Sequence, residues 1–206
     1  MRLERSTPRY TLVAMFLHWI MAIGIATLGA MGLAMTHLKL DPMRLFQLYQ
    51  LHKSIGITVL LAAVMRLAWR MTHTPPALPD TMPEAEKVVA HGGHLVLYVF
   101  LFGLPLTGWA LVSASVFDIP TVLYGVVPWP HLPVLSNLSD KAPVEALLKQ
   151  IHAWGAYVLI AIVVGHAAAA LRHHFILGDD VLLRMLPRLR RKSVQDNHRK
   201  IYSNEH

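Results

Sequence analysis

The sequence predicts an all-α membrane protein, a bundle of four transmembrane helices with both termini in the cytoplasm. Three observations support this fold class. The 206 residues include four long apolar runs with almost no charge inside them, and each run is long enough to cross a hydrocarbon core of about 30 Å. The chain has no cysteine, and several of its 13 histidines lie inside the apolar runs.

The four spans are expected at about residues 11–35, 51–71, 90–115 and 151–175. The connections between them contain residues that interrupt helices, such as Asp41-Pro42 in the first and Pro75-Pro76 in the second. The third connection is the longest and is rich in proline, and its partly apolar stretch around Trp129 is expected to lie at the membrane interface. We therefore predict one four-helix domain over residues 1–187 and a basic cytoplasmic tail over residues 188–206.

The distribution of basic residues predicts the orientation of the bundle. The formal net charge is +7, and the Lys and Arg residues concentrate in the N-terminal segment, the second connection and the C-terminal tail. Short cytoplasmic connections carry such an excess in bacterial membrane proteins. This bias places both termini in the cytoplasm, and it explains the basic charge without nucleic acid as a partner.

The residue types that are absent from the spans exclude several kinds of chemistry. Without cysteine the chain cannot form disulfides, bind iron–sulfur clusters or attach a c-type haem through thioethers. Asp and Glu are also absent from the interiors of the spans, which argues against a carboxylate proton relay and against sites for hard cations. A transporter or metal-permeation protein is therefore disfavoured.

Histidines are the polar groups at membrane depth, and the predicted topology sorts four of them into two levels. His18 lies about two turns inside the cytoplasmic end of the first span. His52 and His152 lie near the outer ends of the second and fourth spans. His166 follows His152 by 14 residues, a rise of about 21 Å in a helix, which brings it to the inner level. The sequence thus predicts an inner pair, His18 with His166, and an outer pair, His52 with His152.

The spacing on the fourth span indicates what these pairs could bind. Two heptads return to nearly the same face of a helix, so one helix can present two imidazoles toward the bundle axis at two heights. Paired neutral imidazoles from facing helices suit the two axial positions of a haem iron. Small residues such as Gly56, Gly155 and Gly165 would let a flat macrocycle approach the backbone, although they also serve close packing of transmembrane helices. The other explanation for a membrane histidine is a hydrogen bond to a neighbouring side chain.

Four segments of the sequence resemble bacterial cytochrome b561. They are LHW at residues 17–19, HGGHLVLY at 91–98, GHAAAALRHHF at 165–175 and DDVLLRMLP at 179–187. The resemblance covers about residues 9–187 and implies the same plan as the haem b subunits of membrane hydrogenases and formate dehydrogenases. Those proteins take haem ligands from the first, second and fourth helices, which implies two b haems here on the four histidines named above.

The resemblance also implies a function. Some members of the family that stand alone oxidise superoxide at the outer face and reduce ubiquinone in the membrane, so we expect a superoxide:ubiquinone oxidoreductase with the lipid bilayer, quinone and superoxide as partners. An alternative of a different class is a cytochrome b subunit that anchors a hydrogenase- or dehydrogenase-type partner and only transfers electrons. No oligomeric state is predicted.

Six further residues are candidates for contact with a haem propionate or a quinone: His91, His94, Arg66, Arg70, His173 and Lys53. The two histidines of the third span lie one turn apart and could equally face lipid head groups. The arginines could equally serve to anchor their helix at the interface. Lys53, beside His52, could also attract an anion such as superoxide.

Overall fold

Four long helices dominate the structure and confirm the prediction of an all-α bundle with four membrane-spanning helices. The computed structural model describes residues 9–79 and 81–187. The four helices are α1 (Leu12–His37), α2 (Pro42–Thr72), α3 (Glu84–Ser113) and α5 (Ala142–Phe175), and each is long and apolar enough to cross a membrane. The predicted tail, residues 188–206, lies outside the described residues, and the domain boundary at 187 stays a prediction.

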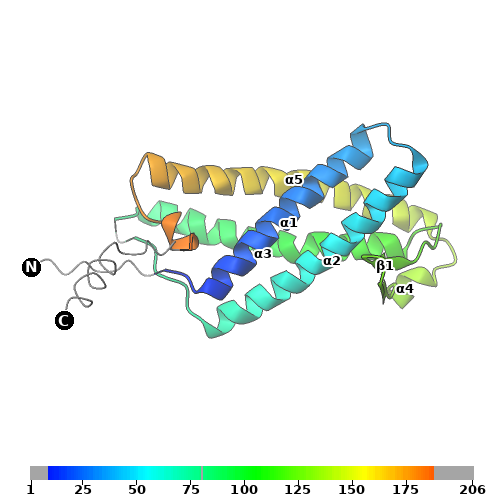
Figure 1. Ribbon diagram of the computed structural model, residues 1–206, viewed down its shortest axis with the longest axis horizontal. Coiled ribbons are helices and arrows are strands. Elements are labelled where there is room, and N and C mark those ends of the chain that lie inside the picture. Colours follow the sequence, from blue (N-terminus) through cyan, green and yellow to red (C-terminus); the bar gives the residue numbers. More distant parts are fainter. Residues whose placement is uncertain (1–8, 80, 188–206) are drawn as a thin grey trace, which may run out of the picture.

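The helices pack as two pairs, which meet mainly between α2 and α3. α1 lies against α2, α3 lies against α5, and α2 also packs on α3 (Figure 1). Met21, Ala63 and Leu101 form the centre of the buried core, one residue each from α1, α2 and α3. Large apolar side chains such as Phe16 and Ile23 point outward instead, 65% and 66% exposed. An apolar exterior of this kind suits lipid rather than water as the surrounding solvent.

Three of the helices begin earlier than the predicted spans, and at α2 the cause is local capping chemistry. Asp41 accepts a hydrogen bond from the backbone N–H of Arg44 and Pro42 occupies the first helical position, so α2 begins there and not near Leu51. α3 begins at Glu84 and α5 at Ala142. The additional turns at each start carry polar residues that a hydropathy estimate assigns to the connections.

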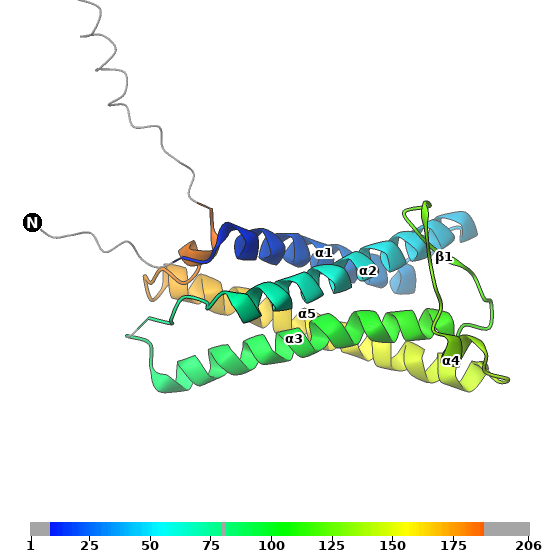
Figure 2. The same cartoon turned by 90° about the horizontal axis from the view of Figure 1, so that it is seen from below.

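The connection between α3 and α5 is folded, which the sequence did not indicate. It contains strand β1 (Thr121–Leu123), strand β2 (Val127–Trp129) and the short helix α4 (Pro133–Ser136). The strands pair antiparallel with Val122 opposite Pro128. Figure 2 shows this hairpin at one end of the bundle, reaching from the α3 side toward α2. We refer to that end as the hairpin end.

The first and last described residues meet at the opposite end, which we refer to as the terminal end. A 3-10 turn, η1 (Leu183–Met185), follows α5 and returns to α1. The backbone N–H of Tyr10 donates to the carbonyl oxygen of Arg184 (3.3 Å), and the indole N–H of Trp19 donates to that of Met185 (2.8 Å). The return segment therefore ties α1 to α5 at the level where the inner histidines are predicted.

Candidate functional site

At the hairpin end, one imidazole from α2 faces one from α5. The ring centroids of His52 and His152 lie 6.2 Å apart. The two histidines come from helices that are separated by about 100 residues of sequence, so only the bundle brings them together. We refer to them as the hairpin pair.

At the terminal end, a second pair of imidazoles has nearly the same separation. The ring centroids of His18 on α1 and His166 on α5 lie 6.3 Å apart, and we refer to these residues as the terminal pair. His94 on α3 adds a third imidazole, 5.5 Å from the ring of His166. Its Nδ1 hydrogen bonds to the carbonyl oxygen of Ala90 at 2.6 Å, so Nδ1 is engaged within its own helix.

The two separations fit axial ligation of one metal ion by two imidazoles. Metal–nitrogen bonds of about 2.0–2.1 Å, with each ring centroid about 1.1 Å behind its nitrogen, put opposed centroids roughly 6.3 Å apart. The 5.5 Å between His94 and His166 is too short for that arrangement. Within residues 9–79 and 81–187, no three His, Cys, Asp or Glu side chains converge as a metal site. Two facing imidazoles at this separation suit an ion whose remaining ligands come from a macrocycle, as in haem.

The imidazole of His152 is oriented by α3. The hydroxyl of Thr107 donates to the carbonyl oxygen of Leu104 at 2.8 Å, so its oxygen is free to accept the Nδ1–H of His152 at 3.1 Å. A proton on Nδ1 leaves the lone pair of Nε2 available for a metal. A Cβ on Gly108 would lie 3.0 Å from Cε1 of this ring, so a larger residue there would press on the imidazole. Sequence reasoning missed Thr107 and Gly108 because their role depends on a contact between helices.

Among the described residues, several buried polar atoms near the hairpin pair have no hydrogen-bond partner. They are Nδ1 of His52, Oε1 of Gln50, Nε1 of Trp129 and Nε2 of His131. An unpartnered polar atom in a protein interior costs about 1–3 kcal/mol. Several such atoms at one end of the bundle fit a site that a polar group completes when it binds.

The terminal pair has a cationic surrounding. The charge of Arg66 acts electrostatically on His18, His94 and His166, and its guanidinium donates to the carbonyl oxygen of Ala14 at 2.9 Å. The guanidinium of Arg70 lies over the ring of Tyr98, 5.7 Å from its centroid. The structure thus brings the predicted Arg66, Arg70 and His94 to the end of the bundle that holds the terminal pair.

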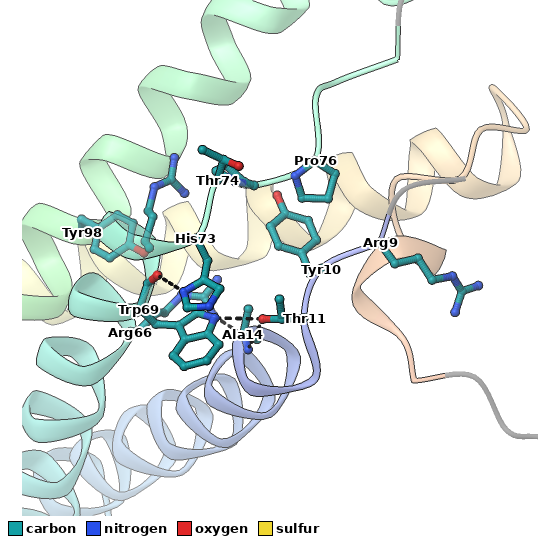
Figure 3. A pocket seen from close by; sticks show the side chains of 12 residues that line it. Arg9, Tyr10, Thr11, Ala14, Arg66, Trp69, His73, Thr74, Pro76 and Tyr98 are labelled. Carbon is teal, nitrogen blue, oxygen red and sulfur yellow. Dashed lines mark hydrogen bonds between the residues drawn. The ribbon is translucent and has the colours of Figure 1, made fainter. Parts of the chain in front are cut away.

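A small pocket opens beside these arginines, between the start of α1 and the end of α2 (Figure 3). Arg9, Arg66 and Arg70 contribute to its lining together with Trp69 and Tyr98. Its volume of about 50 Å³ has room for one or two water molecules. The buried hydroxyl of Tyr98 has no hydrogen-bond partner among the described residues, so the pocket combines positive charge with an unused polar group.

The three remaining predicted residues have hydrogen-bond or ionic partners outside the two pairs. His91 is exposed on α3 and hydrogen bonds to the carbonyl oxygen of Lys87. His173 faces two carboxylates, with Nδ1 on Asp179 and Nε2 3.8 Å from Glu86, so both of its nitrogens have anionic neighbours. The Lys53 ammonium donates to the carbonyl oxygen of Pro120 at 3.4 Å, at the base of the hairpin.

The charges in the connection at the hairpin end largely offset one another. The ammonium of Lys141 donates to Asp118 at 2.6 Å, and this bond holds the pKa of the Asp118 carboxyl below its usual range. Burial is the main cause that lowers the pKa of His131, so this imidazole is neutral near pH 7. Lys53 lies next to the hairpin pair. Within the part of the chain that the structure describes, no carboxylate forms an ion pair with its ammonium group.

The fold and the two pairs define a class: a transmembrane four-helix bundle with facing imidazoles at two levels. The chain matches the family "Prokaryotic cytochrome b561" over residues 9–188. The chain belongs to this family of bacterial membrane proteins, which bind haem b and transfer electrons.

Curated relatives agree with this membership. "Cytochrome b561 homolog 2" of Escherichia coli K12 is 33% identical over 182 residues, which cover 88% of this chain and 93% of the relative. "Cytochrome b561 homolog 1" of the same strain is 30% identical, with coverages of 87% and 98%. "Probable superoxide oxidase CybB" of Yersinia pestis is 32% identical over 142 residues, with coverages of 68% and 75%.

Proposed function

We propose that this protein is a di-haem b oxidoreductase of the bacterial inner membrane, which oxidises superoxide at the hairpin end and reduces ubiquinone in the membrane. Both termini then lie in the cytoplasm and the hairpin end faces the periplasm. The observation that carries the proposal is the pair of centroid separations, 6.3 Å at the terminal pair and 6.2 Å at the hairpin pair. Each matches two imidazoles on one iron.

The four histidines would hold the iron of the two haems. His18 and His166 would hold one haem and His52 and His152 the other, with Thr107 fixing the tautomer of His152. The bound haems supply reversible one-electron redox centres at two depths in the bilayer. A rise of about 21 Å separates His152 from His166 along α5, so the two sites serve opposite halves of the membrane.

The overall reaction balances with two superoxide ions for each quinone. Two superoxide ions each lose one electron and become O₂, and ubiquinone takes up both electrons and two protons to become ubiquinol. At the hairpin end, the ammonium of Lys53 supplies the positive charge that attracts the anionic substrate. At the terminal end, Arg66, Arg70 and His94 are the groups that we assign to a haem propionate or to the quinone. The relative named as a probable superoxide oxidase supports the choice of substrate.

The test is ubiquinol formation by purified protein in lipid nanodiscs that contain ubiquinone, with superoxide generated enzymatically. We expect ubiquinol to form at a rate that superoxide dismutase abolishes and that His52→Ala reduces to the background. Quinol formation no faster than in protein-free nanodiscs, with both haems bound, would contradict the proposal. That outcome, together with a redox partner that co-purifies, would favour the electron-transferring anchor subunit.

A further inference from the structure

The hairpin between α3 and α5 has a tip that turns sharply. Tyr124 and Gly125 both have positive φ, 51° and 73°, and these left-handed residues reverse the chain between β1 and β2. The tip also presents three large side chains outward: Tyr124, Val126 and Val127 are 58%, 78% and 52% exposed. None of the three carries a charge.

Two contacts from the tip fix its depth along α2. The backbone N–H of Tyr124 donates to the hydroxyl of Ser54 at 2.9 Å, and the hydroxyl of Tyr124 hydrogen bonds to that of Thr58 at 2.7 Å. Thr58 follows His52 by six residues, about 9 Å farther along the helix from the hairpin end. The tyrosine side chain therefore reaches deeper into the membrane-crossing part of α2 than the imidazole of the hairpin pair.

The same contacts show which face of α2 the hairpin covers. Ser54 and Thr58 follow His52 by two and six residues, which at 100° per residue places both about 120–160° away from it around the helix. His52 points into the bundle, so the hairpin lies on the side of α2 that faces away from the hairpin pair. It also covers Ser54, which is 1% exposed, and so screens a polar side chain on that side.

We propose that the hairpin tip is a membrane-contact surface, with Tyr124, Val126 and Val127 seated in the lipid leaflet at the hairpin end. The occupant of this surface is phospholipid, at the boundary between head groups and acyl chains. Three features support lipid: the depth set by Thr58, the uncharged exposed tip, and its position on the outward face of a helix that crosses the membrane. A tyrosine with an apolar ring and a polar hydroxyl is typical of this boundary. The hairpin then holds α2 from the lipid side while His52 faces inward.

The absence of cysteine from the chain allows a direct test by single labelling. An environment-sensitive fluorophore is attached to the cysteine of Val126→Cys, and the protein is placed in phosphatidylcholine nanodiscs. Ser139→Cys, labelled in the same way, is the matched control in the same connection. Ser139 is exposed and precedes α5, whose start at Ala142 lies about 15 Å outward of His152 along the helix. Val127→Cys repeats the test at a second exposed tip position, and the haem spectrum reports that each variant is folded.

We expect lipids that carry a quencher near the head group to quench the tip labels at least twofold more than the label at residue 139. Aqueous iodide should do the reverse. Tip labels that iodide quenches as well as the control, without lipid quenching, would overturn the proposal and leave the hairpin in water. Tip labels protected from both quenchers would also overturn it, because a protein surface would then cover the tip.

Discussion

The two ends of the bundle hold imidazole pairs of nearly equal separation in different surroundings. The terminal pair lies near the charge of Arg66 and a third imidazole, His94. The hairpin pair has one cation beside it, Lys53, together with Thr107 as a hydrogen-bond partner and a hairpin that braces α2. The terminal end has two cations, Arg66 and Arg70, that act on its imidazoles, so the same ligand set is tuned more by charge there and more by hydrogen bonding at the hairpin end. Positive charge disfavours the oxidised iron, so the larger charge predicts the higher reduction potential at the terminal end.

The largest expected effect is the loss of one haem at a time. We expect His166→Ala to lower the haem content from about two to about one per chain, since one axial ligand of the terminal pair is removed, and His52→Ala to do the same at the hairpin pair. Haem-to-protein ratios and reduced-minus-oxidised spectra measure this. His91→Ala, an exposed position on α3, should keep both haems. Loss of both haems from either folded variant would break the division into two sites.

Next in size is steric damage to the hairpin pair alone. Gly108→Ala places a Cβ 3.0 Å from the ring of His152, and overpacking of this kind costs about 1–3 kcal/mol. We expect haem occupancy at the hairpin pair to fall several-fold while the terminal pair stays loaded. Gly103→Ala is the control on the same helix, because a Cβ there meets nothing within 4 Å. Equal losses in the two variants would show that the contact with His152 is not the cause.

Removal of charge should shift the potential at the terminal end. Arg66→Gln keeps a side chain that can donate to Ala14 but loses the positive charge. An interaction on the order of 1 kcal/mol corresponds to roughly 40 mV for one electron, so we expect the potential of the terminal haem to fall by about that amount. Redox titration with optical detection measures both haems in one sample. A shift confined to the hairpin haem would reverse the assignment of the two ends.

The smallest effect concerns the hydrogen bond to His152. Thr107→Val removes the acceptor of the Nδ1–H, which makes the imidazole a weaker donor to iron. A neutral hydrogen bond contributes about 1 kcal/mol or less, so we expect the potential of the hairpin haem to rise by at most about 40 mV. The terminal haem serves as the internal control. An unchanged potential at the hairpin haem would mean that another acceptor orients this ring.

The fold and the levels of the four histidines follow from the sequence because both depend on properties of single helices. Hydropathy determines the spans, and the 14-residue interval between His152 and His166 determines their two heights on one face. Whether the four residues are the ligands stays a prediction that the geometry favours. The sequence could not predict residues that act between helices, because the roles of Thr107 and Gly108 depend on the rotation of α3 against α5.

Local pairing explains other differences between the sequence and the structure. His173 lies at a plausible depth for a propionate or quinone, but Asp179 and Glu86 lie beside its two nitrogens. Those neighbours come from a turn after α5 and from the start of α3, which no periodicity connects. The hairpin was missed for a similar reason: its strands have three residues each, too few for an alternating pattern, and contacts with Ser54 and Thr58 stabilise it.

The most direct test of the central claim is the number and ligation of haems in the purified protein. Extraction of haem against amino-acid analysis gives the stoichiometry, and electron paramagnetic resonance of the oxidised protein reports the axial ligands. We predict about two b haems per chain, both low-spin with two imidazole ligands. A single haem per chain, or a high-spin iron with an open axial position at either end, would contradict the account.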